Sequence, residues 1–337
     1  MANESLDPTD RRILDLIQRN FPLAPRPFRI VAEGSATSER DALERIARLK
    51  REGMIREICA VFDAARLGYR STLAALAVEP ARLEEAAAVI SAHPGVSHNY
   101  ERLHLFNLWF TLTIAGSRPV AVEVEGLAHK AGCNDFLNLP ALRRFKIGVD
   151  FDLGTRDVDE IAPEMGVPAA ALDEWRMLEF GPRERSAVRV LQRDLPLVEQ
   201  PFARMAERIS MDEKELLARA DFFLTAGVMR RFGAILHHRH VGYDANVMVG
   251  WTMAPDRMEE AGRRAAAERS VSHCYERPSF PPRWPYNLLT MIHGRSEDGV
   301  REVVRRLESD LQPSGHAMLF SGREFKKQRV HYFEDET

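Results

Sequence analysis

The 337-residue sequence is poor in cysteine and contains no long apolar run. Its three cysteines lie far apart and form no CxxC pair, so the sequence supports neither a disulfide framework nor a zinc ribbon. No apolar stretch approaches the roughly 18 residues that a membrane span requires. The N-terminus, MANESLDPTDRR, is charged and leads into no apolar signal-peptide core. We therefore expect a cytoplasmic protein without a membrane segment.

An excess of either charge is also missing. Lys and Arg number 47 and Asp and Glu number 50, which gives a formal net charge of -3. This balance provides no general attraction for nucleic acid, so any DNA contact would need a local basic patch. Hydrophobic residues at 45% and charged residues at 29% are typical of folded soluble chains and argue against disorder.

The sequence does contain an internal repeat, which emerges when its two halves are aligned. Residues 96–102 (VSHNYER) recur as residues 271–277 (VSHCYER), and residues 53–56 (GMIR) recur as residues 227–230 (GVMR). Two copies with so long a period indicate two fused homologous halves rather than a solenoid.

Each half begins with three short helices and a sharp turn before the third, the pattern of a helix-turn-helix. The apolar spacing predicts these helices at residues 6–20, 28–34 and 38–52, and again at 183–193, 201–209 and 212–226. β-Rich and helix-forming segments then alternate in the order β-α-β-β-α-β, which is that of a ferredoxin-like domain. We therefore predict an α+β fold, a tandem repeat of a winged-helix-like helix-turn-helix domain followed by a ferredoxin-like domain.

The predicted domain boundaries follow from these patterns. The helix-turn-helix domains are expected at residues 1–57 and 177–230, and the ferredoxin-like domains at residues 58–153 and 231–337. Residues 154–176 are rich in acidic side chains and proline, and are predicted to be a linker.

Three motifs of the second half, together with this domain order, carry a resemblance to a known family. They are RRFGAILHH at residues 230–238, HCY at residues 273–275 and WPYNL at residues 284–288. The domain order resembles the Lrp/AsnC superfamily of regulators, and the motifs resemble sirohaem decarboxylases in their fused two-subunit form, over essentially the whole chain. The resemblance implies a carboxy-lyase that removes two acetate carboxyls of sirohaem as CO2 and yields 12,18-didecarboxysirohaem, in d1-type or alternative haem biosynthesis. The iron belongs to the substrate, so no separate cofactor is implied.

The first candidate site is the densest group of cationic and imidazole side chains in the sequence. Its members are Arg230, Arg231, His237, His238, Arg239 and His240. Imidazole is a common ligand of haem iron, and guanidinium groups bind carboxylates bidentately. Residue type alone favours a solvated basic strand end, whereas the resemblance favours a substrate site. Asp63 and Ala64 occupy the places of His237 and His238 in the first half, so the site is predicted in the second half.

The second candidate site lies on a predicted strand, where His273, Tyr275 and Arg277 share one face because side chains alternate. An imidazole, a phenol and a guanidinium in a row suit a macrocycle that carries many carboxylates. The alternative is a polar sheet face at an interface, because His98 and its neighbours repeat the pattern. After the proline-rich loop that follows this strand come three further candidates for contact with the macrocycle, for which core packing is the alternative: Trp284, Tyr286 and Asn287.

In this hypothesis His238 and His273 are the catalytic residues. One of them donates a proton to the nascent methyl carbon, and either is a candidate axial ligand of the substrate iron. The macrocycle itself can delocalise the electron pair that CO2 leaves behind. Substrate binding is assigned to Arg230, Arg231, His237, His240, Tyr275, Arg277, Trp284, Tyr286 and Asn287. The sequence leaves open which histidine has which role.

A DNA-binding regulator and a passive sirohaem or haem carrier are the alternative functions. A recognition helix should present basic or amide side chains to the groove, but residues 210–220 carry three carboxylates beside Lys214 and Arg219. Fused unequal halves also do not reproduce the symmetric dimer that reads a palindrome. We therefore expect sirohaem and its product as partners and disfavour DNA. The chain would form a pseudo-dimer by itself, and pairing of two copies into a homodimer stays open.

Overall fold

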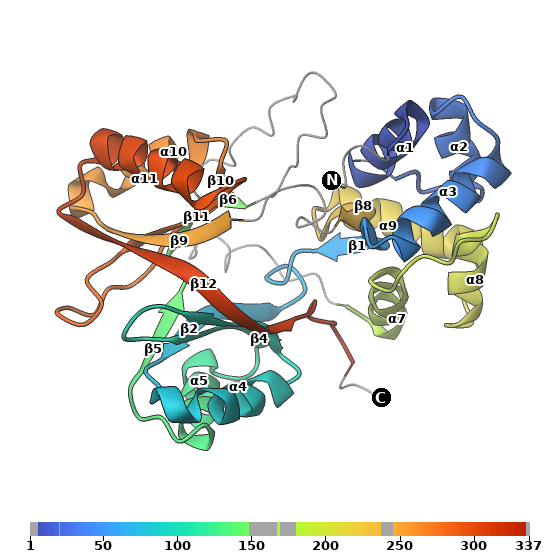
Figure 1. Ribbon diagram of the computed structural model, residues 1–337. Coiled ribbons are helices and arrows are strands. Elements are labelled where there is room, and N and C mark those ends of the chain that lie inside the picture. The colour runs from blue at the N-terminus through green and yellow to red at the C-terminus, as the bar shows by residue number, and fades with distance from the viewer. Residues whose placement is uncertain (1–5, 20, 148–166, 169–179, 237–244, 335–337) are drawn as a thin grey trace. The chain divides into compact units, whose positions relative to one another are not determined.

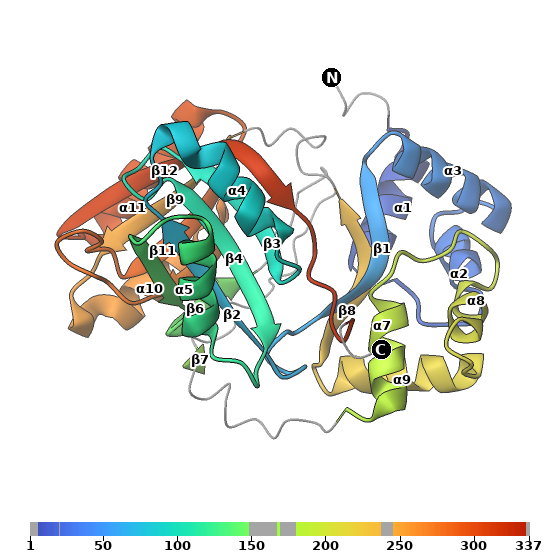
Figure 2. The same ribbon diagram turned by 90° about the horizontal axis from the view of Figure 1, so that it is seen from below.

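The structure is a computed structural model that describes residues 6–19, 21–147, 167–168, 180–236 and 245–334 (Figures 1 and 2). It divides into two compact units, each with segments from both halves of the repeat. The helical unit comprises Met1–Leu67, Met177–Gly242 and His331–Thr337, and the sheet unit comprises Gly68–Arg176 and Tyr243–Val330. Among the helices described, none is long and apolar enough to cross a membrane.

The helical unit contains two sets of three helices, which confirms the predicted helix-turn-helix pattern. They are α1 (Pro8–Arg19), α2 (Pro27–Gly34) and α3 (Glu39–Arg51), and then α7 (Pro182–Leu191), α8 (Pro201–Glu207) and α9 (Glu213–Thr225). A capping side chain starts the third helix of each set. Ser38 accepts a hydrogen bond from the Asp41 amide, and Asp212 accepts from the amides of Lys214 and Glu215. These caps satisfy amides that the first turn of a helix leaves without a partner.

A two-stranded ribbon, with one strand from each half, accompanies the helices. β1 (Ile55–Phe62) and β8 (Met229–Leu236) pair antiparallel, as Figure 2 shows. The amide of Phe21 donates to the carbonyl of Phe232 over 3.2 Å, which ties the first helix set to the strand of the second half. The predicted domain boundaries after residues 57 and 230 fall inside these two strands. Because the two strands come from different halves of the chain, no local sequence pattern predicts that they pair.

The sheet unit follows the predicted order β-α-β-β-α-β twice. The first half supplies β2 (Tyr69–Leu76), η2 (Pro80–Arg82), α4 (Leu83–Ala92), β3 (Val96–Arg102), β4 (Leu108–Ala115), α5 (Val120–Lys130), β5 (Phe136–Pro140) and β6 (Arg143–Ile147). The second half supplies β9 (Ala245–Thr252), η4 (Pro255–Arg257), α10 (Met258–Ala267), β10 (Val271–Glu276), β11 (Leu288–Gly294), α11 (Glu297–Leu311) and β12 (Gly315–Lys327). The only described part of the predicted linker is β7 (Val167–Pro168), which pairs with β6.

These strands form one ten-stranded sheet in the order β5-β2-β4-β3-β12-β9-β11-β10-β6-β7. In each half the fourth strand lies beside the first, and the third lies between the first and the second. This is the ferredoxin-like arrangement, so the predicted α+β fold is confirmed.

Each half passes its last strand to the other half. Residues 315–320 of β12 pair with β9 of their own half, and residues 321–327 continue alongside β3 of the first half. In return β6 of the first half pairs with β10 of the second. Two homologous halves that exchange strands in this way form a pseudo-dimer within one chain.

Three apolar clusters hold the sheet unit together. Helices α4 and α5 cover the outer face of the first half, and α10 and α11 cover that of the second (Figures 1 and 2). A third cluster joins side chains from the strands of both halves, so their inner faces pack on each other. Its large members include Trp109, Met248, Trp284, Leu289 and Leu319.

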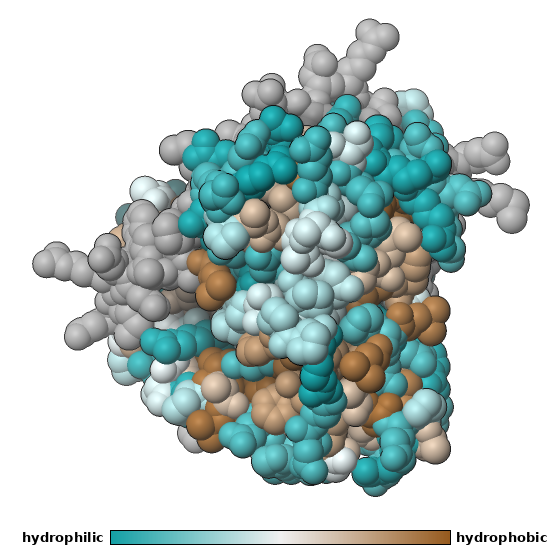
Figure 3. All heavy atoms as spheres, turned by 90° about the vertical axis from the view of Figure 1, so that its left-hand side faces the viewer, coloured by the Kyte–Doolittle hydropathy of each residue, from teal (hydrophilic) through white to brown (hydrophobic). Residues whose placement is uncertain are grey.

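The outer surface of the sheet unit is mixed in polarity. Figure 3 shows brown apolar patches among teal polar ones on the side turned to the viewer. Among the described residues of this unit, the exposed large apolar side chains are Leu103, Leu105, Val122, Leu142 and Phe280. Exposed apolar residues are common on soluble proteins and identify no partner by themselves.

Candidate functional site

The two predicted sites fall in different parts of the structure. His237, His238, Arg239 and His240 lie outside the described residues, so their roles stay predictions. Arg230 and Arg231 lie on β8 in the helical unit, and His273 lies on β10 in the sheet unit.

Arg230 and Arg231 both have partners within the helical unit. The guanidinium of Arg230 donates to Oδ2 of Asp63 from Nη2 over 2.7 Å and from Nε over 3.2 Å. Nη1 of Arg231 donates to the carbonyls of Gln18 at 2.7 Å and Ala234 at 3.2 Å. These contacts tie β8 to the first half of the chain. They favour a structural role over the predicted contact with substrate carboxylates.

His273 and Tyr275 on β10 and Arg277 directly after it lie in a row along one face. The rings of His273 and Tyr275 are nearly parallel, at 22°, with centroids 6.3 Å apart. The guanidinium of Arg277 lies 4.8 Å from the centre of the Tyr275 ring. Cys274, which lies between His273 and Tyr275 in the sequence, points to the opposite face, into the apolar cluster beneath α10. The second half therefore presents an imidazole, a phenol and a guanidinium on the inner side of its sheet.

The imidazole of His273 is held by a hydroxyl that also contacts a second imidazole. Oγ of Ser272 lies 2.9 Å from Nδ1 of His273 and 2.8 Å from Nε2 of His293 on β11. Burial lowers the pKa of His293 to about 4, so its imidazole is neutral near pH 7. The sequence analysis missed His293. The signal was there, because the equivalent residue of the first half is Thr113 and not a histidine.

Arg277 donates a hydrogen bond to a strand of the first half. Its Nη1 donates to the carbonyl of Leu139 on β5. The equivalent Arg102 donates from Nη1 to the carbonyl of Leu319 on β12, over 2.7 Å. Burial lowers the pKa of each guanidinium to about 10, which still leaves both charged near pH 7. The repetition favours a structural role for Arg277, as a support for Tyr275 and the exchanged strands.

Strand exchange adds a cation that the sequence analysis also missed. Arg144 on β6 is the register partner of Tyr275 on β10. In the first half the equivalent Tyr100 is the register partner of Glu324 on β12, and its hydroxyl lies 3.2 Å from that carboxylate. A guanidinium therefore stands in the second half where a carboxylate stands in the first.

Trp284, Tyr286 and Asn287 pack into the protein. Trp284 is fully buried between Trp109 and Tyr286, whose ring centroids lie 5.1 and 4.9 Å away. The side chain of Asn287 accepts from the amide of Met253 and donates to its carbonyl, over 2.8 Å each. These contacts correspond to the core packing that the sequence left open as the alternative.

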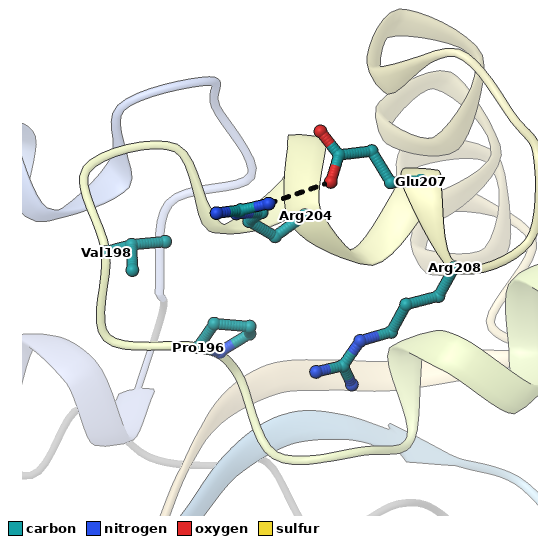
Figure 4. A pocket seen from close by; sticks show the side chains of 5 residues that line it. All are labelled: Pro196, Val198, Arg204, Glu207 and Arg208. Atoms are coloured by element: carbon teal, nitrogen blue, oxygen red, sulfur yellow. Dashed lines mark hydrogen bonds and ion pairs between the residues drawn. The ribbon is translucent and has the colours of Figure 1, made fainter.

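The helical unit has a surface hollow of a different chemistry. Its lining residues are Pro196, Val198, Arg204, Glu207 and Arg208 (Figure 4). Arg204 is paired with Glu207 over 3.2 Å, and Arg208 points toward Pro196. With neither an imidazole nor an aromatic ring among these lining residues, the hollow lacks the groups expected of a site for an iron macrocycle.

Family models match most of the chain in two alternating blocks. A model described as "Siroheme decarboxylase NirDL-like HTH domain" matches residues 10–56 and 184–230, and one described as "AsnC-like ligand binding domain" matches residues 66–146 and 240–326. The matched blocks repeat in the same order in both halves. They agree with the tandem organisation seen in the sequence and in the fold.

Individual relatives and structures agree with these models. A "Siroheme decarboxylase" of Hydrogenobacter thermophilus is 38% identical over 96% of this chain and 95% of its own. The "Siroheme decarboxylase beta subunit" of Desulfovibrio desulfuricans is 39% identical and matches 46% of this chain with 98% of its own length, as expected if two subunits are fused here. A crystal structure of the siroheme decarboxylase NirDL in co-complex with an iron-uroporphyrin III analogue is 33% identical, covers 97% of this chain and 95% of its own, and has a TM-score of 0.76. The chain belongs to the siroheme decarboxylase family, in its fused two-subunit form.

Proposed function

We propose that this chain decarboxylates sirohaem at a site in its second half, removing two acetate carboxyls as CO2 to give 12,18-didecarboxysirohaem. The observation that carries the proposal is a difference between the strands that flank β10 in the second half and those that flank the equivalent β3 in the first half. The second half has His293 and Arg144 where the first half has Thr113 and Glu324. A cationic face with a hydrogen-bonded imidazole suits a substrate rich in carboxylates.

The chemistry requires one proton for each CO2 released. Cleavage of the bond between the acetate CH2 and its carboxylate leaves an electron pair on the CH2 carbon, and the macrocycle delocalises that pair. A proton added to the same carbon then completes a methyl group. His273 is the proposed donor because its ring is held at Nδ1 by Ser272, at 2.9 Å, on the face that it shares with Tyr275. Arg144 is the proposed partner of a substrate carboxylate.

The three histidines outside the described residues enter the proposal as the sequence predicts them. His238 is the second catalytic candidate, and either it or His273 ligates the substrate iron while the other donates the proton. His237 and His240 are proposed to bind substrate. We further propose that the enzyme is a carboxy-lyase of the cytoplasm, that it needs no cofactor beyond the iron of its substrate, and that it serves d1-type or alternative haem biosynthesis.

A DNA-binding regulator is disfavoured because several basic side chains of the third helices, Arg45 and Arg48 on α3 and Arg219 on α9, already have carboxylate partners. Arg45 on α3 pairs with Asp7, Asp10 and Asp41 at 2.6, 2.9 and 2.7 Å. Arg48 pairs with Asp10 at 2.6 Å. Contact with a DNA phosphate would have to displace these carboxylates, which opposes the charge neutralisation that drives nucleic-acid binding.

Anaerobic incubation of the purified protein with sirohaem, followed by mass spectrometry, tests the proposal. We expect loss of the mass of two CO2 molecules, and we expect His273→Ala to abolish or strongly slow this loss. A change in sirohaem absorbance without loss of mass would leave a carrier. Absence of sirohaem binding, together with a salt-dependent mobility shift on promoter DNA, would favour a regulator.

A further inference from the structure

We propose that His293 is a positioning residue for His273, and that it acts through the hydroxyl of Ser272. The proposal rests on the proposed function, because it concerns the imidazole assigned there to proton donation. It adds a residue that neither the sequence motifs nor the likeness to relatives had assigned to the site.

The geometry is a chain of two short contacts between three side chains. Nε2 of His293 lies 2.8 Å from Oγ of Ser272, and Oγ lies 2.9 Å from Nδ1 of His273. Both distances are those of good hydrogen bonds. A third contact of Ser272, to the carbonyl of Met291, is longer at 3.3 Å. The serine is buried, with 5% of its surface exposed, so bulk water does not compete freely for its hydroxyl.

The hydroxyl couples the protonation of the two rings because it has a single proton. If Ser272 donates to Nδ1 of His273, the neutral ring carries its proton on Nε2 and can only donate a hydrogen bond from it. If Ser272 instead accepts from Nδ1, then Nε2 of the neutral ring has a lone pair that can bind a metal or take up a proton, and the imidazolium formed by that proton can pass it on to the substrate carbon. Nε2 of His293 contacts the same hydroxyl, and whether it donates to Oγ or accepts from it decides which way the hydroxyl proton points. The tautomer of His293 therefore biases the tautomer of His273. Burial favours the neutral form of His293, as its lowered pKa indicates, which gives it one N–H and one acceptor nitrogen.

The first half of the sheet unit provides an internal comparison. Ser97 and His98 repeat the contact between Ser272 and His273, with the same 2.9 Å separation. At the place of His293 stands Thr113, whose hydroxyl lies 2.7 Å from that of Ser71. The contact between serine and histidine is thus common to both halves, whereas the second imidazole belongs to the second half alone. A residue needed only to fold the repeated hairpin would be expected in both halves.

The first test measures the single-turnover rate of sirohaem decarboxylation and the dissociation constant of sirohaem in matched variants. His293→Thr, which installs the residue of the first half, should slow the rate about 10–100-fold, the usual cost of losing a residue that orients a functional histidine. Ser272→Ala should slow it similarly, and the double variant should be no slower than the worse single variant within about twofold. The dissociation constant should change less than about threefold in each case.

Two further variants separate positioning from folding. His293→Gln retains a polar group that reaches the hydroxyl and should recover most of the rate. Ser97→Ala removes the equivalent hydroxyl from the first half and should keep the rate within about twofold of the starting protein. Nitrogen-15 NMR of the histidine side chains, without sirohaem, supplies a readout that does not depend on catalysis. One tautomer of His273 should dominate in the starting protein, and the two tautomers should average in His293→Thr.

The outcomes that overturn the proposal are distinct from those that overturn the function. A full rate in His293→Thr, an equal loss in Ser97→Ala, or averaged tautomers already present in the starting protein would each rule out the positioning role. Failure of the starting protein to decarboxylate sirohaem would rule out the proposed function. In that case the NMR comparison would still decide whether His293 fixes His273.

Discussion

Replacement of Arg102 by methionine tests whether buried guanidinium groups hold the exchanged strands. Arg102 is 5% exposed, and its Nη1 donates to the carbonyl of Leu319 at 2.7 Å and to Oγ of Ser321 at 3.2 Å. Two hydrogen bonds from a charged donor contribute about 1.5–3 kcal/mol each. Burial lowers the pKa of Arg102 to about 10, so keeping the guanidinium charged inside the protein costs about 3 kcal/mol.

The substitution removes both effects and leaves the buried Leu319 carbonyl without this donor, at a cost of about 1–3 kcal/mol. Taken together, Arg102→Met should lower the free energy of unfolding of the sheet unit by about 1–6 kcal/mol. Urea unfolding followed by tryptophan fluorescence measures this change, because Trp109, Trp251 and Trp284 are all buried in that unit.

A matched control lies on β12, the strand whose Leu319 carbonyl accepts from Arg102. Arg323 of β12 is half exposed and pairs with Glu84 and Glu101 at the surface, where water screens the ion pairs, so Arg323→Met should leave the free energy of unfolding close to that of the starting protein. If Arg102→Met were as stable as the starting protein or more so, the apolar side chain would have replaced the buried charge without loss. The strand exchange would then depend on its backbone ladder and apolar packing, and not on Arg102.

Three further predictions concern pH, charge and the helical unit. Burial lowers the pKa of His293 from its ordinary 6.5 to about 4, so the unfolded chain takes up this proton first as the pH falls. Through this residue the free energy of unfolding should drop by about 3 kcal/mol between pH 6.5 and pH 4. His293→Gln should remove this part of the pH dependence, which urea unfolding at several pH values measures. Arg144→Glu should weaken sirohaem binding at least about tenfold in an absorbance titration, whereas Glu324→Gln in the first half should leave it unchanged; equal effects would contradict the assigned asymmetry. Asp63→Asn should lower the thermal stability of the helical unit by about 1–3 kcal/mol, because Arg230 loses a carboxylate that is only 7% exposed; an unchanged melting temperature would argue against this ion pair as a tie of the β1–β8 ribbon.

Local patterns in the sequence were sufficient to predict the fold within each half. Helix caps such as Ser38 and Asp212, the 3.6-residue apolar spacing and the repeated hairpin motif all act over a few residues. The ribbon of β1 and β8 and the exchange of β6 and β12 depend on which distant strand each one meets. Short strands carry little information about that choice, so neither feature could be predicted.

The same distinction explains the site residues. Strand alternation placed His273 and Tyr275 on one face because it needs only their spacing. Arg144 escaped notice because it reaches β10 only through the exchange of β6. His293 could have been found from the sequence, because it stands at a position where the two halves differ, with Thr113 as its equivalent. Trp284 is fully buried in the core, which is the usual location of a large aromatic side chain.

The central claim is that this chain removes two carboxyl groups from sirohaem at a site in its second half. The most direct measurement is the anaerobic mass spectrum of sirohaem after incubation with the protein and, in parallel, with His273→Ala and with His98→Ala. The account predicts loss of two CO2 for the starting protein and for His98→Ala, and little or no loss for His273→Ala. Unchanged sirohaem with the starting protein, or full conversion by His273→Ala, would contradict it.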